Sequence, residues 1–299
     1  MTLWDVREGD ALEVLRALPD GAFDAAVSDP PYPEIDRPYG RLSEDDWMAL
    51  MQGVVTELRR VLTLRGSAVL ILQPNSEVVG RMRPWLWKFL VWASETWGVV
   101  QDAYWWNIAA PPTIHCNRTR GLMRPSVKHC IWLGSPDCYR NQDAVLWEPS
   151  EAQKSVNLED RALRHQPSGQ SMRPGRLAAT VQERGGCTPF NLLPIPNTIS
   201  SNHSGHSAAT PEALLSWWVR YLCPHGGSVI DPFSGSGTTG LVAVQLGRRY
   251  LGIERDHEYA ESSRLRIARV DRFMARPTRP GTAFGPLFAP SAAPPIAEE

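Results

Sequence analysis

The chain has 299 residues, of which 42% are hydrophobic and 21% are charged, and its formal net charge is −1. This composition is ordinary for a globular protein with a sizeable core, and it excludes a polycation and a collagen-like chain. No apolar run approaches the roughly 20 residues that span a bilayer, so no membrane partner is expected. The N-terminal residues lack the regions of a signal peptide and the five cysteines form no CxxC pair, which favours a cytoplasmic protein with reduced thiols.

Residues 1–134 alternate between predicted strands and helices. Strands are expected at Trp4–Arg7, Phe23–Ser28 and Ala68–Leu72, the last being a continuous apolar run typical of a strand buried on both faces. Helices are expected to follow Asp10 and Ser43, because each of these capping residues precedes apolar residues at spacings of three and four. The alternation predicts an α/β fold with a mostly parallel sheet.

Residues 135–205 lose this rhythm and are rich in Gly, Pro, Ser, Asn, Gln and Arg, so we expect a loop-rich insert that packs on the main domain. The rhythm resumes at Thr210, which is expected to cap a helix with Pro211 at its first position. Further elements are expected at Glu212–Leu222, Val229–Ile230, Thr238–Leu246, Tyr250–Ile253 and 258–273. The expected units are two halves of one domain, 1–134 and 206–275, with the insert 135–205 between them and a flexible tail at 276–299.

A glycine-rich turn, Asp231-Pro232-Phe233-Ser234-Gly235-Ser236-Gly237-Thr238, lies between a predicted strand and a predicted helix. Glycines at such a turn let the backbone approach a ligand closely, and no Lys follows Gly237 to make it a phosphate loop. Turns of this kind also occur for purely structural reasons. Glu254, which ends the next predicted strand, is well placed to bind both hydroxyls of a ribose, and the pair favours a cofactor that contains a nucleoside.

A second motif, Asp29-Pro30-Pro31-Tyr32, follows the predicted strand at 23–28. A polar strand end with a proline turn is a common structural arrangement. The chemistry indicates another role, since the Asp29 carboxylate and the Pro30 carbonyl are two acceptors beside the π-face of Tyr32. Such a trio suits an amino group on a planar base, whose two hydrogens it would hold while the lone pair attacks an electrophile.

The two motifs resemble motifs IV and I of the S-adenosylmethionine-dependent DNA amino-methyltransferases. Because Asp29–Tyr32 precede Asp231–Gly237, the order resembles the β class, a circular permutation. The resemblance extends to further segments, which are Gly9–Glu13, Leu18–Asp20, Arg60–Leu62 with Gly66, Trp106-Asn107, Ser126–His129 and, as motif X, His206–Pro211. It implies a Rossmann-like sheet with both motifs at the carboxyl ends of neighbouring strands, and it places the insert 135–205 as the target-recognition region.

The resemblance also implies the roles of individual residues. Asp29, Pro30, Pro31 and Tyr32 would hold the target amine, and no catalytic cysteine is expected because the amine is itself the nucleophile. Asp29 at the first position favours adenine N6 over cytosine N4, which stays the alternative. S-adenosylmethionine would be bound by Asp10 near the adenine, by Glu254 at the ribose, by the turn residues Asp231, Phe233, Ser234, Gly235, Ser236, Gly237 and Thr238, and by His206 at the methionine portion. The segment at His206 lacks the aromatic residue that often precedes Pro211 in the family.

A basic stretch supplies the candidate contacts to DNA phosphates, which are Arg118, Arg120, Arg124 and Lys128; a solvated loop is the alternative. His115-Cys116 and His129-Cys130 fit no standard zinc spacing, so no metal is expected.

The expected partner is double-stranded DNA, with a restriction endonuclease as a candidate partner and either a monomer or a homodimer as the assembly. Two rivals are a non-catalytic DNA-binding subunit, which the intact motifs argue against, and methylation of RNA or protein amides, which the motif order and the insert argue against.

Overall fold

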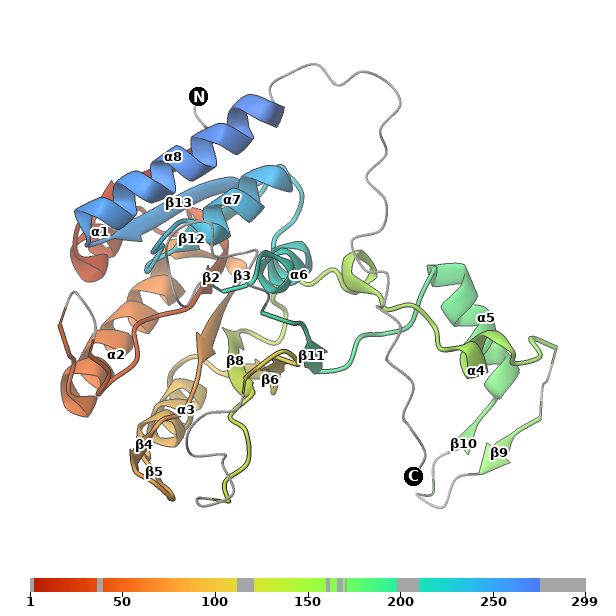
Figure 1. Cartoon of the computed structure of the whole chain (residues 1–299). Coiled ribbons are helices and arrows are strands. Elements are labelled where there is room, and N and C mark those ends of the chain that lie inside the picture. The colour runs from red at the N-terminus through yellow and green to blue at the C-terminus, as the bar shows by residue number, and fades with distance from the viewer. Residues whose placement is uncertain are drawn as a thin grey trace.

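One mixed sheet organises the molecule (Figure 1). The computed structural model describes residues 3–36, 40–111, 121–159, 162–165, 169, 171–197 and 210–274. Within these residues nine strands join in the order β1-β13-β12-β2-β3-β8-β7-β11, with β6 also paired to β8. The tail predicted at 276–299 and the predicted phosphate-contact and methionine-site residues Arg118, Arg120 and His206 lie outside the described residues.

The first half of the sheet is parallel. It comprises β1 (Trp4–Glu8), β13 (Arg249–Glu254), β12 (Ser228–Asp231), β2 (Phe23–Ser28) and β3 (Leu62–Leu72). β8 (Val127–Gly134) pairs antiparallel with β3, and it also pairs antiparallel with β7 (Tyr104–Trp106) and β6 (Val99–Gln101). The predicted strands are present, and their carboxyl ends bring the two sequence motifs to one edge of the sheet, as expected for parallel neighbours.

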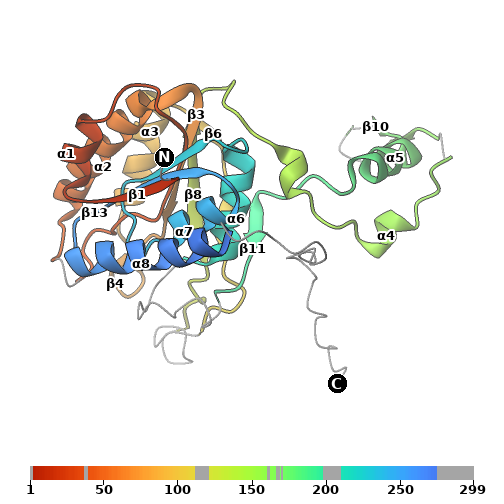
Figure 2. The same ribbon diagram turned by 90° about the horizontal axis from the view of Figure 1, so that it is seen from above.

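Helices cover both faces of this sheet (Figure 2). α1 (Ala11–Arg16), α2 (Glu44–Val61) and α3 (Trp85–Thr96) pack one face through a cluster that includes Leu15, Trp47 and Phe89. α6 (Glu212–Leu222), α7 (Thr238–Gln245) and α8 (His257–Met274) pack the other through Trp218, Val242 and Ile267. None of the helices in the described ranges is long and apolar enough to cross a membrane.

Local sequence explains where the first helices begin. Asp10 Oδ1 accepts hydrogen bonds from the N–H groups of Leu12 and Glu13, which caps α1. Ser43 Oγ accepts from Asp46 N, and three acidic residues in the first turn of α2 favour the positive end of its dipole. The prediction that Thr210 caps α6 is wrong. Pro211 occupies the N-cap position, and the Thr210 hydroxyl is bonded elsewhere.

The predicted insert divides into two parts. Near its ends, the short helix η2 (Gln142–Val145) packs beside α6, and β11 (Leu192–Pro194) joins the main sheet by pairing with β7. Between them, α4 (Glu151–Lys154), α5 (Pro174–Arg184), β9 (Arg164–His165) and β10 (Ser171–Met172) project away from the sheet (Figures 1 and 2). Backbone hydrogen bonds between Trp147 and Cys187, of 2.8 and 2.9 Å, close the base of this projection, 148–186.

A candidate active site between two neighbouring strands

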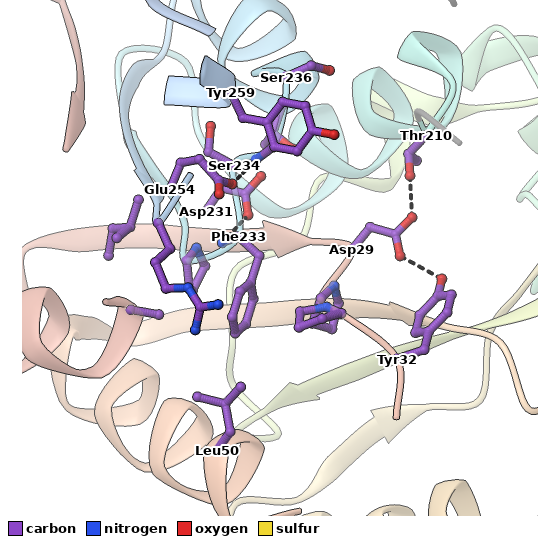
Figure 3. Close-up of a pocket in the computed structure, with 18 of the residues that line it drawn as sticks. Asp29, Tyr32, Leu50, Thr210, Asp231, Phe233, Ser234, Ser236, Glu254 and Tyr259 are labelled. Atoms are coloured by element: carbon purple, nitrogen blue, oxygen red, sulfur yellow. Dashed lines mark hydrogen bonds between the residues drawn. The ribbon is translucent and has the colours of Figure 1, made fainter. Parts of the chain in front are cut away.

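A cavity of about 570 Å³ lies at the carboxyl ends of β2 and β12, and both sequence motifs line it (Figure 3). The glycine turn and Glu254 form one part of the wall, and Asp29 and Tyr32 form another. α2 contributes Leu50 to the lining. The fold therefore joins the predicted cofactor-binding and catalytic residues in one continuous site, although they are about 200 positions apart in the sequence.

Asp231 ties the two strands together. Ser28 Oγ, at the end of β2, donates to Asp231 Oδ1 over 2.5 Å, and the N–H of Phe233 donates to the same oxygen over 3.0 Å. Burial raises the pKa of Asp231 to about 6, although the hydrogen bonds from Ser28 and Thr239 act in the opposite direction. Asp231 thus fixes the turn against β2 and sets the spacing between the halves of the site.

Helix α8 packs against the glycine turn on the side away from the cavity. Gly237 has φ of +79°, and a Cβ there would lie 2.1 Å from Ser263 Oγ, so only glycine fits. Arg266 of α8 donates from Nη1 to the Ser236 carbonyl over 2.6 Å and to Ser236 Oγ over 3.0 Å. These contacts fix the backbone of the turn, leaving its other side to the cavity.

Glu254 ends β13 beside this turn. Its Oε2 accepts the N–H of Gly235 over 2.8 Å and its Oε1 accepts the N–H of Asp256 over 2.9 Å, while burial raises its pKa. The backbone orients the Glu254 carboxylate, and each of its oxygens can still accept a second hydrogen bond. The Gly9 N–H donates to the Glu254 carbonyl over 2.9 Å, which brings the cap of α1, Asp10, to the same cavity.

Asp29 lies at the centre of a polar cluster in the second part of the cavity. Tyr32 donates its hydroxyl to Asp29 Oδ1 over 2.6 Å, and Thr210 donates its hydroxyl to Asp29 Oδ2 over 2.5 Å (Figure 3). Lys128 Nζ is 3.4 Å from the same Oδ2. Trp47 Nε1 donates to the Pro31 carbonyl over 2.6 Å, which anchors the proline turn to the core of α2.

The family model of the N6/N4 DNA methylases matches residues 23–265. The chain belongs to this family. The methylase is 25% identical over 277 residues to the DNA adenine methyltransferase YhdJ of Escherichia coli, a match that covers 89% of this chain and 83% of YhdJ. It is 23% identical over 275 residues to the type II methyltransferase M.PvuII of Proteus hauseri, covering 87% of this chain and 82% of M.PvuII.

Solved structures share the fold of this methylase. It resembles the PvuII DNA methyltransferase, described as cytosine-N4-specific, with a TM-score of 0.67 at 19% identity, covering 91% of this chain and 92% of that one. It also resembles TTHA0409 of Thermus thermophilus, solved in complex with S-adenosyl-L-methionine, with a TM-score of 0.56 at 21% identity. That match covers 89% of this chain and 95% of TTHA0409. These similarities confirm the predicted Rossmann-like methyltransferase sheet.

The structure separates the predicted phosphate-contact residues of the methylase. Lys128 lies inside the cavity against Asp29 and Tyr32, whereas Arg124 Nη1 donates to the Ala110 carbonyl over 2.9 Å. Phosphate contact by either residue stays a prediction. In the described part of the chain, no group of three His, Cys, Asp or Glu residues is arranged to hold a metal ion.

Three residues of the site escaped prediction in the roles they have here. Thr210 was expected as a helix cap, Lys128 as a phosphate contact, and Arg266 carried no expectation at all. The signal for Lys128 is its place within Ser126–His129, a segment that resembles a catalytic-domain motif of the family. Thr210 lies in the segment that resembles motif X, but that resemblance does not predict its bond to Asp29. Arg266 has no sequence signal, because it reaches the turn only through the tertiary fold.

Proposed function

We propose that this DNA methylase transfers a methyl group from S-adenosylmethionine to the exocyclic amine of a DNA base, with adenine N6 as the target. The observation that carries the proposal is the single cavity with a strand-end carboxylate, Glu254, in one part and the Asp29–Tyr32 motif in the other. The family shows that the chain is a DNA methylase. The cavity supports the assignment of Glu254 to the cofactor and of the Asp29–Tyr32 motif to the target base.

The cavity residues fit S-adenosylmethionine. Glu254 has free acceptor capacity for ribose hydroxyls, and Phe233 and Leu50 offer an apolar wall beside it (Figure 3). Asp10 supplies a carboxylate at the adenine portion. TTHA0409 was solved with this molecule bound, which supports the same cofactor here. When bound, it supplies the electrophilic methyl group.

Asp29, Pro30 and Tyr32 orient the target. The Asp29 carboxylate and the Pro30 carbonyl accept the two amine hydrogens, and the Tyr32 ring stacks on the base. With both hydrogens held, the nitrogen lone pair would be free to bond to the methyl carbon, and the bond between that carbon and the cofactor sulfur would break to leave S-adenosylhomocysteine. The methylated nitrogen must then lose a proton, which Asp29 can accept because its carboxylate holds one of the amine hydrogens in this arrangement. No covalent bond to the protein forms, so no nucleophilic side chain is needed.

Asp29 at the first position of the motif supports adenine, and the similarity to YhdJ, named as an adenine methyltransferase, agrees. The similarity to M.PvuII makes cytosine N4 the second candidate, because its solved structure is described as cytosine-N4-specific. We further propose residues 135–205 as the target-recognition region, supported by the projection of 148–186 beyond the sheet (Figure 1). Double-stranded DNA is the proposed partner.

The proposal is tested in a host that lacks DNA methylation. Genomic DNA from cells that express the protein is sequenced by a modification-sensitive method, and its nucleosides are analysed by mass spectrometry. We expect N6-methyladenine at one short sequence, and none with the variant Asp29→Ala. Detection of N4-methylcytosine in place of N6-methyladenine would make cytosine the target. The absence of both modified bases would overturn the proposal.

A further inference from the structure

Lys128 holds a position in the cavity that phosphate contact does not explain. It lies on β8 directly opposite Trp105 of β7, and its Nζ is 2.9 Å from the Tyr32 hydroxyl and 3.4 Å from Asp29 Oδ2. Only 18% of its side chain is exposed. The buried ring of Trp105, with its centroid 5.1 Å from Nζ, packs against the ammonium group and fixes its place.

The ammonium group lies beside the hydroxyl of Tyr32. Nζ is 5.3 Å from the ring centroid of Tyr32 but only 2.9 Å from its hydroxyl oxygen. These distances differ by most of the length from the hydroxyl to the ring centre, so Nζ lies beyond the hydroxyl and not over the ring. In the proposed function the base stacks on Tyr32, and Lys128, beyond the hydroxyl, would then meet the edge of that base.

Lys128 has one donor to spare. An ammonium group has three N–H bonds, and Tyr32 and Asp29 account for two of them. Among the residues that the structure describes, none accepts the third. An ammonium donor without a partner is costly in a side chain that is only 18% exposed, so an acceptor that arrives with the substrate would be favoured here.

We propose that Lys128 donates to the ring nitrogen next to the target amine, which is N1 of adenine or N3 of cytosine. The inference rests on the proposed function, in which Asp29 holds that amine. Because Nζ is 3.4 Å from the same carboxylate, the neighbouring ring atom falls within its reach. Adenine and cytosine both carry an acceptor at this position. Thymine carries N3–H beside its 4-keto group and guanine carries N1–H beside its 6-keto group, and either N–H would face the lysine donor. Lys128 therefore disfavours a base that enters with such a keto edge toward Asp29.

The test replaces one atom of the base. Once the recognition sequence is mapped, the target is exchanged for its deaza analogue, 1-deazaadenine or 3-deazacytosine, in which C–H replaces the ring nitrogen. Single-turnover rates are compared for the native protein, Lys128→Met and Lys88→Met, the last being an exposed lysine on α3. We expect the analogue to slow the native protein and Lys88→Met by roughly 10-fold or more, as for loss of a charge-assisted hydrogen bond.

Lys128→Met is expected to be slow on the natural base and to show no further loss on the analogue. An equal fold-loss in Lys128→Met and in the native protein would overturn the proposal, because the lysine would then only position Tyr32 and Asp29. If Lys128→Met is too slow to measure, the affinities for the natural and the analogue duplex are compared instead, with S-adenosylhomocysteine present. Lys128→Arg should keep the sensitivity to the analogue. Failure of the proposed function would look different, since the native protein would then methylate no natural base.

Discussion

At the scale of single residues, hydrogen bonds from neighbouring side chains orient Asp29. Both of its oxygens accept hydrogen bonds, from Tyr32 on one side and from Thr210 on the other. This network points the carboxylate before any substrate arrives, which is the preorganisation that favours a transition state over a ground state. We therefore expect the Asp29 network to lower the barrier of the methyl-transfer step.

Replacing Asp29 with Ala should abolish methyl transfer and leave cofactor binding intact. Loss of one such transition-state contact typically costs a few kcal/mol, or ~10²-fold or more in rate. A single-turnover assay measures the rate, and calorimetry with S-adenosylmethionine measures the binding. Near-native turnover by Asp29→Ala would refute the role given to this carboxylate.

Glu254→Ala should show the opposite pattern, with weaker cofactor affinity. A pair of hydrogen bonds to a charged group is lost, and each is worth about 1.5–3 kcal/mol at most. Glu258→Ala, which removes an exposed carboxylate four positions later on α8, is the matched control. Unchanged affinity of Glu254→Ala in titration calorimetry would remove Glu254 from the ribose site.

Asp231 makes stability depend on pH in a defined direction. Its pKa is raised by burial from 3.8 to about 6, so between these values the folded protein keeps a proton that the unfolded chain has lost. The free energy of unfolding therefore falls as pH rises through this window, by about 3 kcal/mol when complete.

Asp231→Asn should remove this pH dependence, because the amide oxygen can still accept from Ser28 and Phe233. The variant should gain stability over the native protein above pH 6 and lose that gain toward pH 4. Urea unfolding of the cofactor-free protein across this range measures it. An identical pH profile for both proteins would mean that the buried carboxyl is not strained by its charge.

At the scale of elements, α8 supports the glycine turn from outside the cavity. Arg266 crosses from this helix to the Ser236 carbonyl and to the hydroxyls of Ser236 and Thr238. These bonds satisfy polar groups that a turn rich in glycine would otherwise leave to water. The turn is therefore held by a side chain thirty positions later in the sequence.

Arg266→Met should weaken cofactor binding while α8 stays folded, since the long apolar part of the side chain is kept. We expect roughly a 10-fold loss of affinity, in line with loss of one charge-assisted hydrogen bond. Arg269→Met, an exposed arginine of the same helix, is the control and should bind normally. Circular dichroism and calorimetry separate an unfolded helix from a loosened turn.

The sequence predicts the helices and parallel strands well because their signals are local. Asp10 caps α1, and the apolar run at 68–72 is part of β3, as expected. β11 was not predicted, because three residues within a polar stretch become a strand only through pairing with β7. Lys128 and Thr210 could not be placed at Asp29 for the same reason, since pairing of β8 with β3 and the start of α6 bring them there.

At the scale of the whole molecule, the projection 148–186 is a separable attachment. Trp147 and Cys187 close its base, and Arg184 binds Asp143 of η2 over 2.6 Å just inside it. None of the predicted catalytic or cofactor-binding residues lies in this segment. The proposed function therefore assigns sequence recognition and chemistry to different parts of the chain.

Exchanging 148–186 for the corresponding segment of a relative with another specificity should change the methylated sequence without changing the modified base. With the junctions placed at Trp147 and Cys187, whose backbones are hydrogen-bonded to each other, the exchange leaves η2 and β11 unaltered. Sequencing of DNA from cells that express the chimera reads both results at once. An active chimera with the original recognition sequence would move the recognition region elsewhere.

The strand order also has a consequence during synthesis. β12 and β13, which come last along the chain, lie between β1 and β2, which come first. A nascent chain that has not yet reached Ser228 therefore lacks both strands that join β1 to β2, and β2 has an unpaired edge that a chaperone or another chain can reach. The Ser28–Asp231 bond closes only after that gap is filled. Ribosome-bound chains should accordingly stay open to protease until β13 emerges, and then become resistant in one step.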